Sequence, residues 1–187
     1  MNETKAVGTR GEKSLHAALK RWYAQPGDQV EAMVDGYRVD IVRDDLLIEI
    51  QTGSFGALRE KLNRLLVGHT VRLVYPVAVE KWIVRLGADG TLVSRRRSPK
   101  RGRVEDVFAE LIRLPALMSH PHFTLEVLLI RAEEQRRNDG LGSWRRQGWS
   151  LHDHILLEVI EPGAPIVSTT GKASRPRSSG APCCSTR

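Results

Sequence analysis

The stretch RVDIVRDDLLIEIQTG (38–53) decides the predicted fold. Apolar and polar residues alternate on both sides of a short charged turn at Arg43–Asp45, which is typical of two antiparallel strands. The first strand is predicted over 37–42 and the second over 46–51. When two successive strands pair, residues that are separated in sequence come into direct contact across the pair.

Alternation assigns the residues of this pair to two faces. In the first strand, Val39 and Ile41 are expected to point to one face and Asp40 to the other. In the second strand, Glu49 and Gln51 are expected on the face opposite to the two isoleucines. The sequence therefore predicts that Asp40 and Glu49 lie side by side.

The residues on either side of this strand pair predict an α/β domain. The spacing of Leu15, Ala18, Leu19 and Trp22 is typical of one face of a helix, and Asp35-Gly36 is a strong hairpin signal. The other expected elements are a helix over 12–23, a strand over 29–34, a helix over 55–67, strands over 70–76, 81–86 and 91–94, helices over 104–114 and 124–137, and a strand over 148–161. The predicted organisation is a core over 8–94, a basic loop over 95–103, a mostly helical basic appendage over 104–161 and a disordered tail over 162–187.

The net charge of +7 is concentrated in the second half of the chain. Residues 91–187 hold 16 basic and 10 acidic side chains, and RRRSPKRGR (95–103) has six cations in nine residues. Such a segment attracts phosphates, and the alternative is a solvated linker without a partner. The predicted nucleic-acid-binding residues are Arg95, Arg96, Arg97, Lys100, Arg101 and Arg103.

Other protein classes are disfavoured by simple features of the sequence. No apolar run approaches the roughly 20 residues of a membrane span, and the first residues lack the apolar core of a signal peptide. The two cysteines are adjacent, at Cys183 and Cys184, and no Cys/His spacing typical of zinc sites is present. The paired histidines at 120/122 and 152/154 are interpreted as structural or surface residues. We expect a cytoplasmic protein with no membrane partner.

Two neighbouring carboxylates point to a chemical function. Like charges at Asp40 and Glu49 raise at least one pKa unless a cation lies between them. Mg²⁺ binds to one or two carboxylates, waters and substrate phosphate oxygens, so this pair is typical of a magnesium site.

This arrangement resembles the PD-(D/E)XK, or restriction-endonuclease-like, nuclease superfamily, with the layout of its Holliday-junction resolvases. That family has a helix, a three-stranded meander, a helix and a further strand, with an acid on the second strand and (D/E)-X-K on the third. Asp40 matches the first acid, Glu49-Ile50-Gln51 matches the tripeptide with Gln in place of Lys, and Glu12 matches a helix glutamate.

The resemblance implies metal-dependent hydrolysis of DNA phosphodiesters. Its catalytic residues would be Glu12, Asp40, Glu49 and Gln51, and Mg²⁺ or Mn²⁺ would bind to Asp40, Glu49 and the carbonyl of Ile50. The resolvase-like layout leaves a homodimer open.

The glutamine raises a question about activity. A neutral amide orients water but does not offset negative charge, so Lys61 or Arg59 on the following helix is a candidate for the missing cation. The alternatives are a catalytically weak or inactive nucleic-acid-binding module of the same fold and an interaction domain without DNA affinity. On the simplest alternative, Asp40 and Glu49 lie on a solvated sheet face and Lys61 is an ordinary surface residue.

Overall fold

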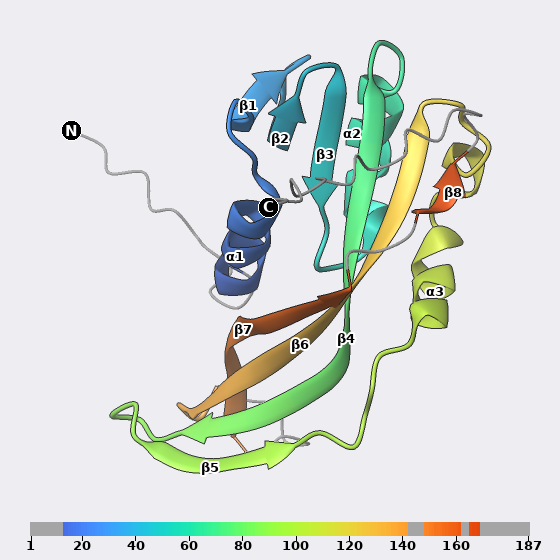
Figure 1. Ribbon diagram of the computed structural model, residues 1–187. Coiled ribbons are helices and arrows are strands. Elements are labelled where there is room, and N and C mark those ends of the chain that lie inside the picture. The colour runs from blue at the N-terminus through green and yellow to red at the C-terminus, as the bar shows by residue number, and fades with distance from the viewer. Residues whose placement is uncertain (1–12, 142–147, 162–164, 169–187) are drawn as a thin grey trace, which may run out of the picture.

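A mixed sheet of eight strands runs through the described part of the chain, and helices cover both of its faces (Figure 1). The computed structural model describes residues 13–141, 148–161 and 165–168. In chain order the elements are α1 (Lys13–Tyr23), β1 (Gln29–Val34), β2 (Tyr37–Arg43), β3 (Leu46–Ile50), η1 (Phe55–Leu58), α2 (Arg59–Leu65), β4 (Thr70–Leu86), β5 (Leu92–Arg97), η2 (Val104–Asp106), α3 (Val107–Leu111), η3 (Pro115–Leu117), β6 (Phe123–Asn138), β7 (Trp149–Glu161) and β8 (Pro165–Ser168).

The strand order is β1-β2-β3-β4-β6-β7, with β5 paired to β4 and β8 paired to β6. The first three strands form the predicted antiparallel meander, in which Ile41 pairs with Ile48 across the turn. β4 runs parallel to β3 on one side and to β6 on the other. The α/β class and the order of elements up to β4 are confirmed.

Two hydrophobic clusters lie on the two faces of the sheet. Leu47 belongs to the cluster with Leu62 of α2 and Val107 of α3, whereas Ile48 belongs to the cluster with Leu19 of α1. Neighbouring residues of a strand point to opposite faces, so α1 covers one face and α2 and α3 cover the other. The sheet face on which Glu49 lies is therefore buried under α2 and α3. This excludes the alternative in which Glu49 lies on a solvated sheet face.

The predicted alternation of β2 is wrong around Asp40. Val39 and Ile41 are both fully buried, yet Val39 packs in the cluster of α2 and Ile41 in the cluster of α1. The β1–β2 pairs skip Glu31, opposite Asp40, and Glu31 has a φ of +58°. The left-handed backbone of Glu31 interrupts the regular hydrogen-bond pattern between β1 and β2 at Asp40. The Asp40 side chain is therefore not confined to the face that simple alternation assigns to it.

The helix predicted over 124–137 is also wrong, because this segment is the long strand β6. Leu125 packs on the α2 and α3 face and Leu128 on the α1 face. A strand that is covered on both faces shows a nearly continuous apolar run, and this run hides the alternation of a strand. The segment after Val104 is therefore not a mostly helical appendage, because β6 and β7 lie in the same sheet as the meander.

Several smaller boundaries differ from the prediction. The two strands expected over 70–76 and 81–86 are one strand, β4, and Arg95–Arg97 of the expected basic loop belong to β5. Within the tail predicted to be disordered, Pro165–Ser168 forms β8 against β6. The rest of that tail, 162–164 and 169–187, lies outside the described residues.

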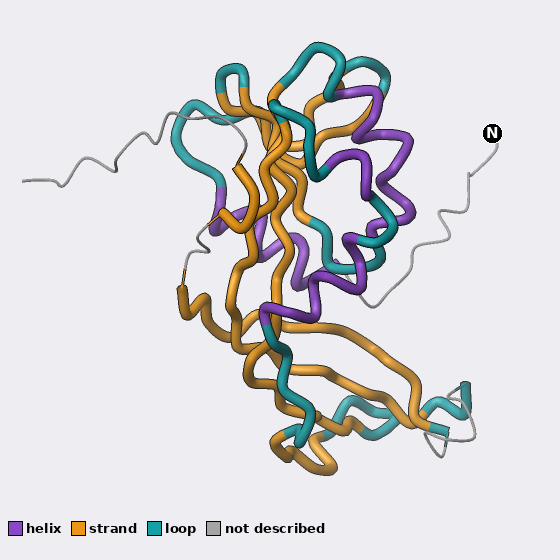
Figure 2. Tube along the Cα trace, turned by 90° about the vertical axis from the view of Figure 1, so that its right-hand side faces the viewer, coloured by secondary structure: helices purple, strands orange, loops and turns teal. Residues whose placement is uncertain are grey.

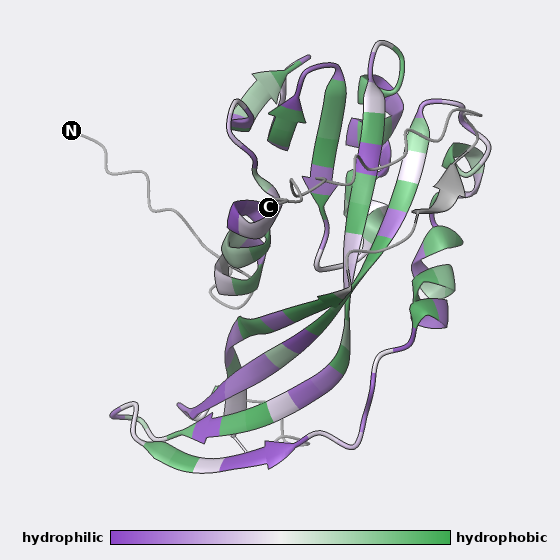
Figure 3. Ribbon diagram, in the orientation of Figure 1, coloured by the Kyte–Doolittle hydropathy of each residue, from purple (hydrophilic) through white to green (hydrophobic). Residues whose placement is uncertain are grey.

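The far end of the sheet forms an arm, defined here as β5 with residues 80–86 of β4, 131–138 of β6 and 149–158 of β7, and α1 borders it at β7, where Ser14 donates to Asp153. Figure 2 shows that the strands of the arm bend away from the upper part of the sheet. The end of β5 is strongly hydrophilic (Figure 3). Among the described helices, none is long and apolar enough to cross a membrane.

Candidate active site

Asp40 and Glu49 lie next to each other where β2 and β3 separate. Each carboxylate accepts a main-chain N–H from the other strand: Ile50 N donates to Asp40 Oδ2 at 2.9 Å, and Asp40 N donates to Glu49 Oε1 at 3.4 Å. The interrupted ladder at Asp40 makes this exchange possible, because the side chain takes the place of a main-chain partner. The two acids are therefore neighbours, but the predicted shared face is wrong, because Asp40 is contacted by α1 and Glu49 by α2.

Two basic side chains from α1 contact Asp40. His16 Nε2 lies 3.1 Å from Oδ2, and Lys20 Nζ lies 3.8 Å from Oδ1. Burial of the carboxyl opposes ionisation, but the hydrogen bond and charge of His16, the N–H of Ile50 and the charge of Lys20 together lower the pKa of Asp40. Asp40 is thus held as a carboxylate, and its side chain is 15% exposed.

Glu49 receives a cation from the opposite face of the sheet. Lys61 Nζ, on α2, lies 2.5 Å from Glu49 Oε1 and also donates to the carbonyl of Arg38. Glu49 is only 3% exposed, and this burial, with the nearby charge of Asp40, raises the pKa of Glu49 although Lys61 lowers it. The two carboxylates are neighbours with opposite pKa shifts, a pattern that clusters at functional sites.

The other predicted catalytic residues are placed differently. Gln51 follows β3 and donates its amide to the carbonyl of Ser54 at 2.8 Å, so this donor closes the local turn. Glu12 lies outside the described residues. Of the two cations proposed for the missing lysine, Lys61 reaches Glu49.

Sequence reasoning did not identify His16 and Lys20. They are four residues apart on α1, beside the buried positions Leu15 and Leu19, and therefore project from one side of the helix. The spacing was visible in the sequence, but the side of α1 that faces Asp40 depends on how the helix packs across the sheet. We call Asp40, Glu49, Lys61, His16 and Lys20 the candidate site.

The donors available for a divalent cation are two carboxylates and the carbonyl of Ile50. No group of three or more His, Cys, Asp or Glu side chains placed to hold a metal occurs among the described residues, which do not include Glu12. Mg²⁺ needs only one or two protein carboxylates when waters and phosphate oxygens complete its shell, so Asp40 and Glu49 fit this ion.

The predicted DNA-binding cations fall into two groups. Arg95 pairs with Glu133 at 3.2 Å and Arg97 pairs with Glu80 at 2.5 Å, and both guanidinium groups lie against the ring of Trp82. These two arginines are largely neutralised within the arm. The other four have no acidic partner within the part of the chain that the structure describes, and they are Arg96, Lys100, Arg101 and Arg103.

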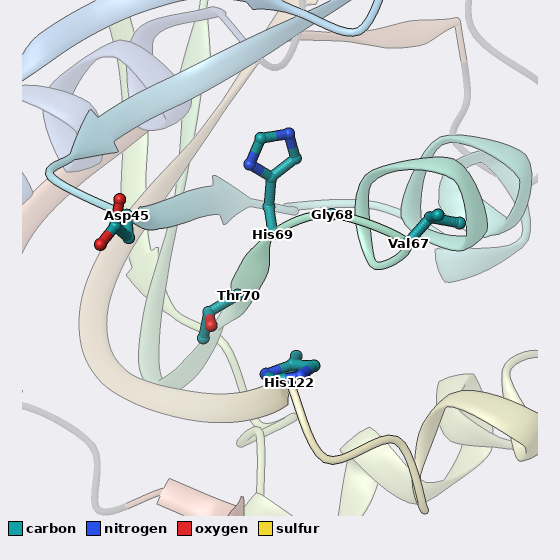
Figure 4. A pocket seen from close by; sticks show the side chains of 6 residues that line it. All are labelled: Asp45, Val67, Gly68, His69, Thr70 and His122. Atoms are coloured by element: carbon teal, nitrogen blue, oxygen red, sulfur yellow. The ribbon is translucent and has the colours of Figure 1, made fainter.

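A second polar region lies at the opposite ends of the strands. A hollow of about 190 Å³ is lined by residues that include Asp45, Thr70, His69 and His122 (Figure 4). His69 is bonded to Asp35 at 3.1 Å, and the two imidazole rings do not face each other. Because these residues precede β3, β4 and β6, the hollow is separate from the candidate site near the end of β3.

Comparison with known proteins gives one family and one close relative. A family model described as a domain of unknown function, DUF8091, matches residues 13–163. An uncharacterized protein of Treponema pallidum (strain Nichols) is 35% identical over 154 residues, which are 82% of this chain and 61% of that protein. The chain thus spans less than two thirds of the length of this relative. No solved structure matches.

Proposed function

We propose that this chain, which belongs to the DUF8091 family, hydrolyses DNA phosphodiesters with the help of a divalent metal ion at Asp40 and Glu49. The observation that carries the proposal is the contact between Lys61 Nζ and Glu49 Oε1 at 2.5 Å. This contact supplies a cation beside two acids in a chain whose tripeptide has Gln51 where the resembling superfamily has lysine.

The arrangement of elements supports the same proposal. The order α1, β1, β2, β3, α2, β4, with an antiparallel meander and then a parallel strand, is the order that the resemblance to the PD-(D/E)XK superfamily implies, and it supports the proposal. Asp40 lies on the second strand of the meander and Glu49 on the third. Lys61 comes from the following helix rather than from the position two residues after Glu49, so the equivalent cation would reach the acids from another element.

The residues of the candidate site have distinct roles in such a reaction. Asp40, Glu49 and the Ile50 carbonyl would hold Mg²⁺ or Mn²⁺, which polarises a phosphate and lowers the pKa of a bound water. Lys61 offsets the negative charge that develops on the phosphate oxygens. His16 and Lys20 keep Asp40 ionised, which a metal ligand requires.

A second candidate function is a DNA-binding module without turnover. Each acid already has a lysine nearby, Lys61 for Glu49 and Lys20 for Asp40, and Asp40 is also hydrogen-bonded to His16, so a metal ion has to compete with these contacts. The amide of Gln51 is bound to Ser54 and is not directed at the acids. The unpaired cations at 96 and 100–103 attract phosphates in either case.

The test is cleavage of linear, branched and single-stranded DNA in Mg²⁺ or in EDTA. We expect Asp40→Asn to lower the rate by about 100-fold or more and Lys61→Gln by about 10-fold or more, since a metal ligand and a charge-stabilising group are lost. The matched control is Arg64→Gln, which removes an exposed charge from the same helix and should change the rate by less than about 2-fold.

The outcomes separate the candidates. DNA binding that persists in all variants, without cleavage by the wild type in either metal, would favour the binding module. Equal losses in Lys61→Gln and Arg64→Gln contradict a role for Lys61. A wild type that neither cleaves nor binds DNA leaves only the interaction domain.

A further inference from the structure

The basic segment after β5 is fixed along the edge of β4. Ser98 N donates to the carbonyl of Lys81 at 2.7 Å, and Gly102 N donates to the carbonyl of Ala78 at 2.8 Å. A Cβ atom at Gly102 would lie 2.8 Å from both that carbonyl oxygen and Val77 Cγ1, so only glycine permits this close approach. The cations of the segment are therefore held in place beside β4.

A hollow of about 260 Å³ lies between this segment and the sheet. One side is apolar and aromatic, with Tyr75, Val77 and Ala78 of β4, and the other has Lys100, Gly102 and Asp106. Lys81 also borders the hollow, and its ammonium group pairs with Glu134.

The charged side chains around the hollow differ in whether they already have a partner in the protein. Asp106 accepts the N–H of Arg103 at 2.9 Å and so serves to begin the helical segment that follows. Lys100 has no acidic partner anywhere in the described residues. The hollow thus combines an aromatic wall with one cation that has no acidic partner, Lys100, and one carboxylate, Asp106, whose charge the main-chain hydrogen bond does not remove.

The hollow lies near Glu49, on the face of the sheet that α2 and α3 cover, whereas Asp40 is contacted from the α1 face. Gln51 N donates to the carbonyl of Val74 at 2.9 Å, which places Tyr75 beside the end of β3. Glu49 pairs with Leu73, and Leu73 and Val77 belong to the same cluster. Val77, which lines the hollow, lies four positions after Leu73 along β4, a rise of about 13 Å.

We propose that this hollow binds one unpaired nucleotide of the DNA strand that passes the candidate site, with its base against Tyr75 and its phosphate on Lys100. An aromatic wall beside a cation is the combination that binds single-stranded nucleic acid, whereas a duplex offers only stacked bases and does not enter a hollow of this size. The proposal rests on the proposed function for the identity of the strand, and it assigns the substrate class as DNA with a single-stranded portion.

The experiment measures binding without cleavage. Full-length Asp40→Asn protein in EDTA is titrated with a fluorescent 12-nucleotide thymidine strand and with a 12-base-pair duplex, at one fixed salt concentration. We expect the single strand to bind more tightly. Lys100→Ala or Tyr75→Leu in this background should weaken single-strand binding about 5- to 10-fold, and duplex binding less than 2-fold.

The matched control is Arg96→Ala, which removes another cation without an acidic partner, at a position that does not line the hollow. It should weaken binding of both DNAs by the same small factor. Thermal unfolding identifies variants that do not fold, and Tyr75→Phe, which retains the ring, should bind the single strand as tightly as its parent.

Three results overturn the proposal: equal effects of Lys100→Ala and Arg96→Ala on both DNAs, equal affinity for the two DNAs, or saturation by thymidine monophosphate without binding of the strand. The last identifies a site for a free nucleotide. Since no cleavage is measured, a wild type without nuclease activity leaves these results interpretable and counts only against the proposed function.

Discussion

Glu49 in the candidate site and Glu134 in the arm are a matched pair of buried glutamates. Their exposed fractions are 3% and 7%, and each has a lysine close by, Lys61 at 2.5 Å and Lys81 at 2.8 Å. Their pKa values nevertheless shift in opposite directions. The pKa of Glu49 is raised, whereas that of Glu134 falls from 4.5 to about 2.

The difference comes from the second neighbour of each carboxylate. Burial raises the pKa of both groups, but Glu134 has Arg136 as a second cation, at 2.6 Å, and the hydrogen bonds and charges of Lys81 and Arg136 outweigh burial. The second neighbour of Glu49 is another acid, Asp40. The charge of Glu134 is compensated by two cations, which suits a structural role. Glu49 and Asp40 share fewer cations for each acid, which suits binding of an added cation.

The largest expected difference between the two glutamates is in activity. We expect Glu49→Gln to lower Mg²⁺-dependent DNA cleavage by about 100-fold or more, because a metal ligand is lost. Glu134→Gln should leave cleavage per folded molecule within about 3-fold, since the arm contact is structural. The assay is run at a temperature where circular dichroism shows both variants folded. A comparable loss of cleavage in both variants would contradict a difference in role between the two glutamates.

Stability should show the opposite ranking. We expect Glu134→Gln to destabilise the protein by about 2–3 kcal/mol at pH 7, because it leaves Lys81 and Arg136 with uncompensated buried charge. Glu49→Gln should cost less than Glu134→Gln, since it removes a carboxylate whose ionisation burial already opposes and leaves one lysine, Lys61, without its acid rather than two cations. Urea unfolding of both variants measures these values, and a larger cost at Glu49 would contradict the comparison.

The same two variants should depend on pH in opposite ways. The folded-state pKa of Glu134 is depressed, so its contribution is complete above pH 4.5 and disappears as the pH falls toward 2. The cost of Glu134→Gln should therefore shrink in acid. The folded-state pKa of Glu49 is raised, so its ionisation costs the wild type stability as the pH rises above 4.5, and the relative cost of Glu49→Gln should fall over that range. Unfolding free energies between pH 3 and 7 distinguish the two slopes.

The smallest effect is expected at Gln51. Gln51→Lys restores the lysine of the tripeptide, but Lys61 already supplies a cation to Glu49, and Gln51 is bonded to Ser54. Cleavage should be retained and should change by less than about 3-fold. In the Lys61→Gln background, the same substitution should recover part of the lost rate. An unchanged rate in the double variant shows that a lysine at 51 does not reach the acids.

The sequence alone determined the parts of the fold in which contacts are local. The spacing of Leu15 and Leu19 predicted α1, and the short turn at Arg43–Asp45 fixed the pairing that brings Asp40 and Glu49 together. In the structure the two strands are joined by only two residues, Asp44 and Asp45, so few alternative registers exist, and a slip by one residue would turn the buried isoleucines of β3 to the other face.

Only the tertiary structure decided what surrounds those acids. Lys61 reaches Glu49 from one face and His16 reaches Asp40 from the other, and both contacts depend on how helices pack across the sheet. The same holds for the arm, where Arg95 and Arg97 read as free cations in the sequence but pair with acids of β6 and β4. The sequence of β6 predicts a helix, because burial on both faces of the sheet removes the alternation that is typical of a strand. Periodicity reports which residues of one element share a face, whereas the partner across that face is set by long-range packing, which leaves no local pattern.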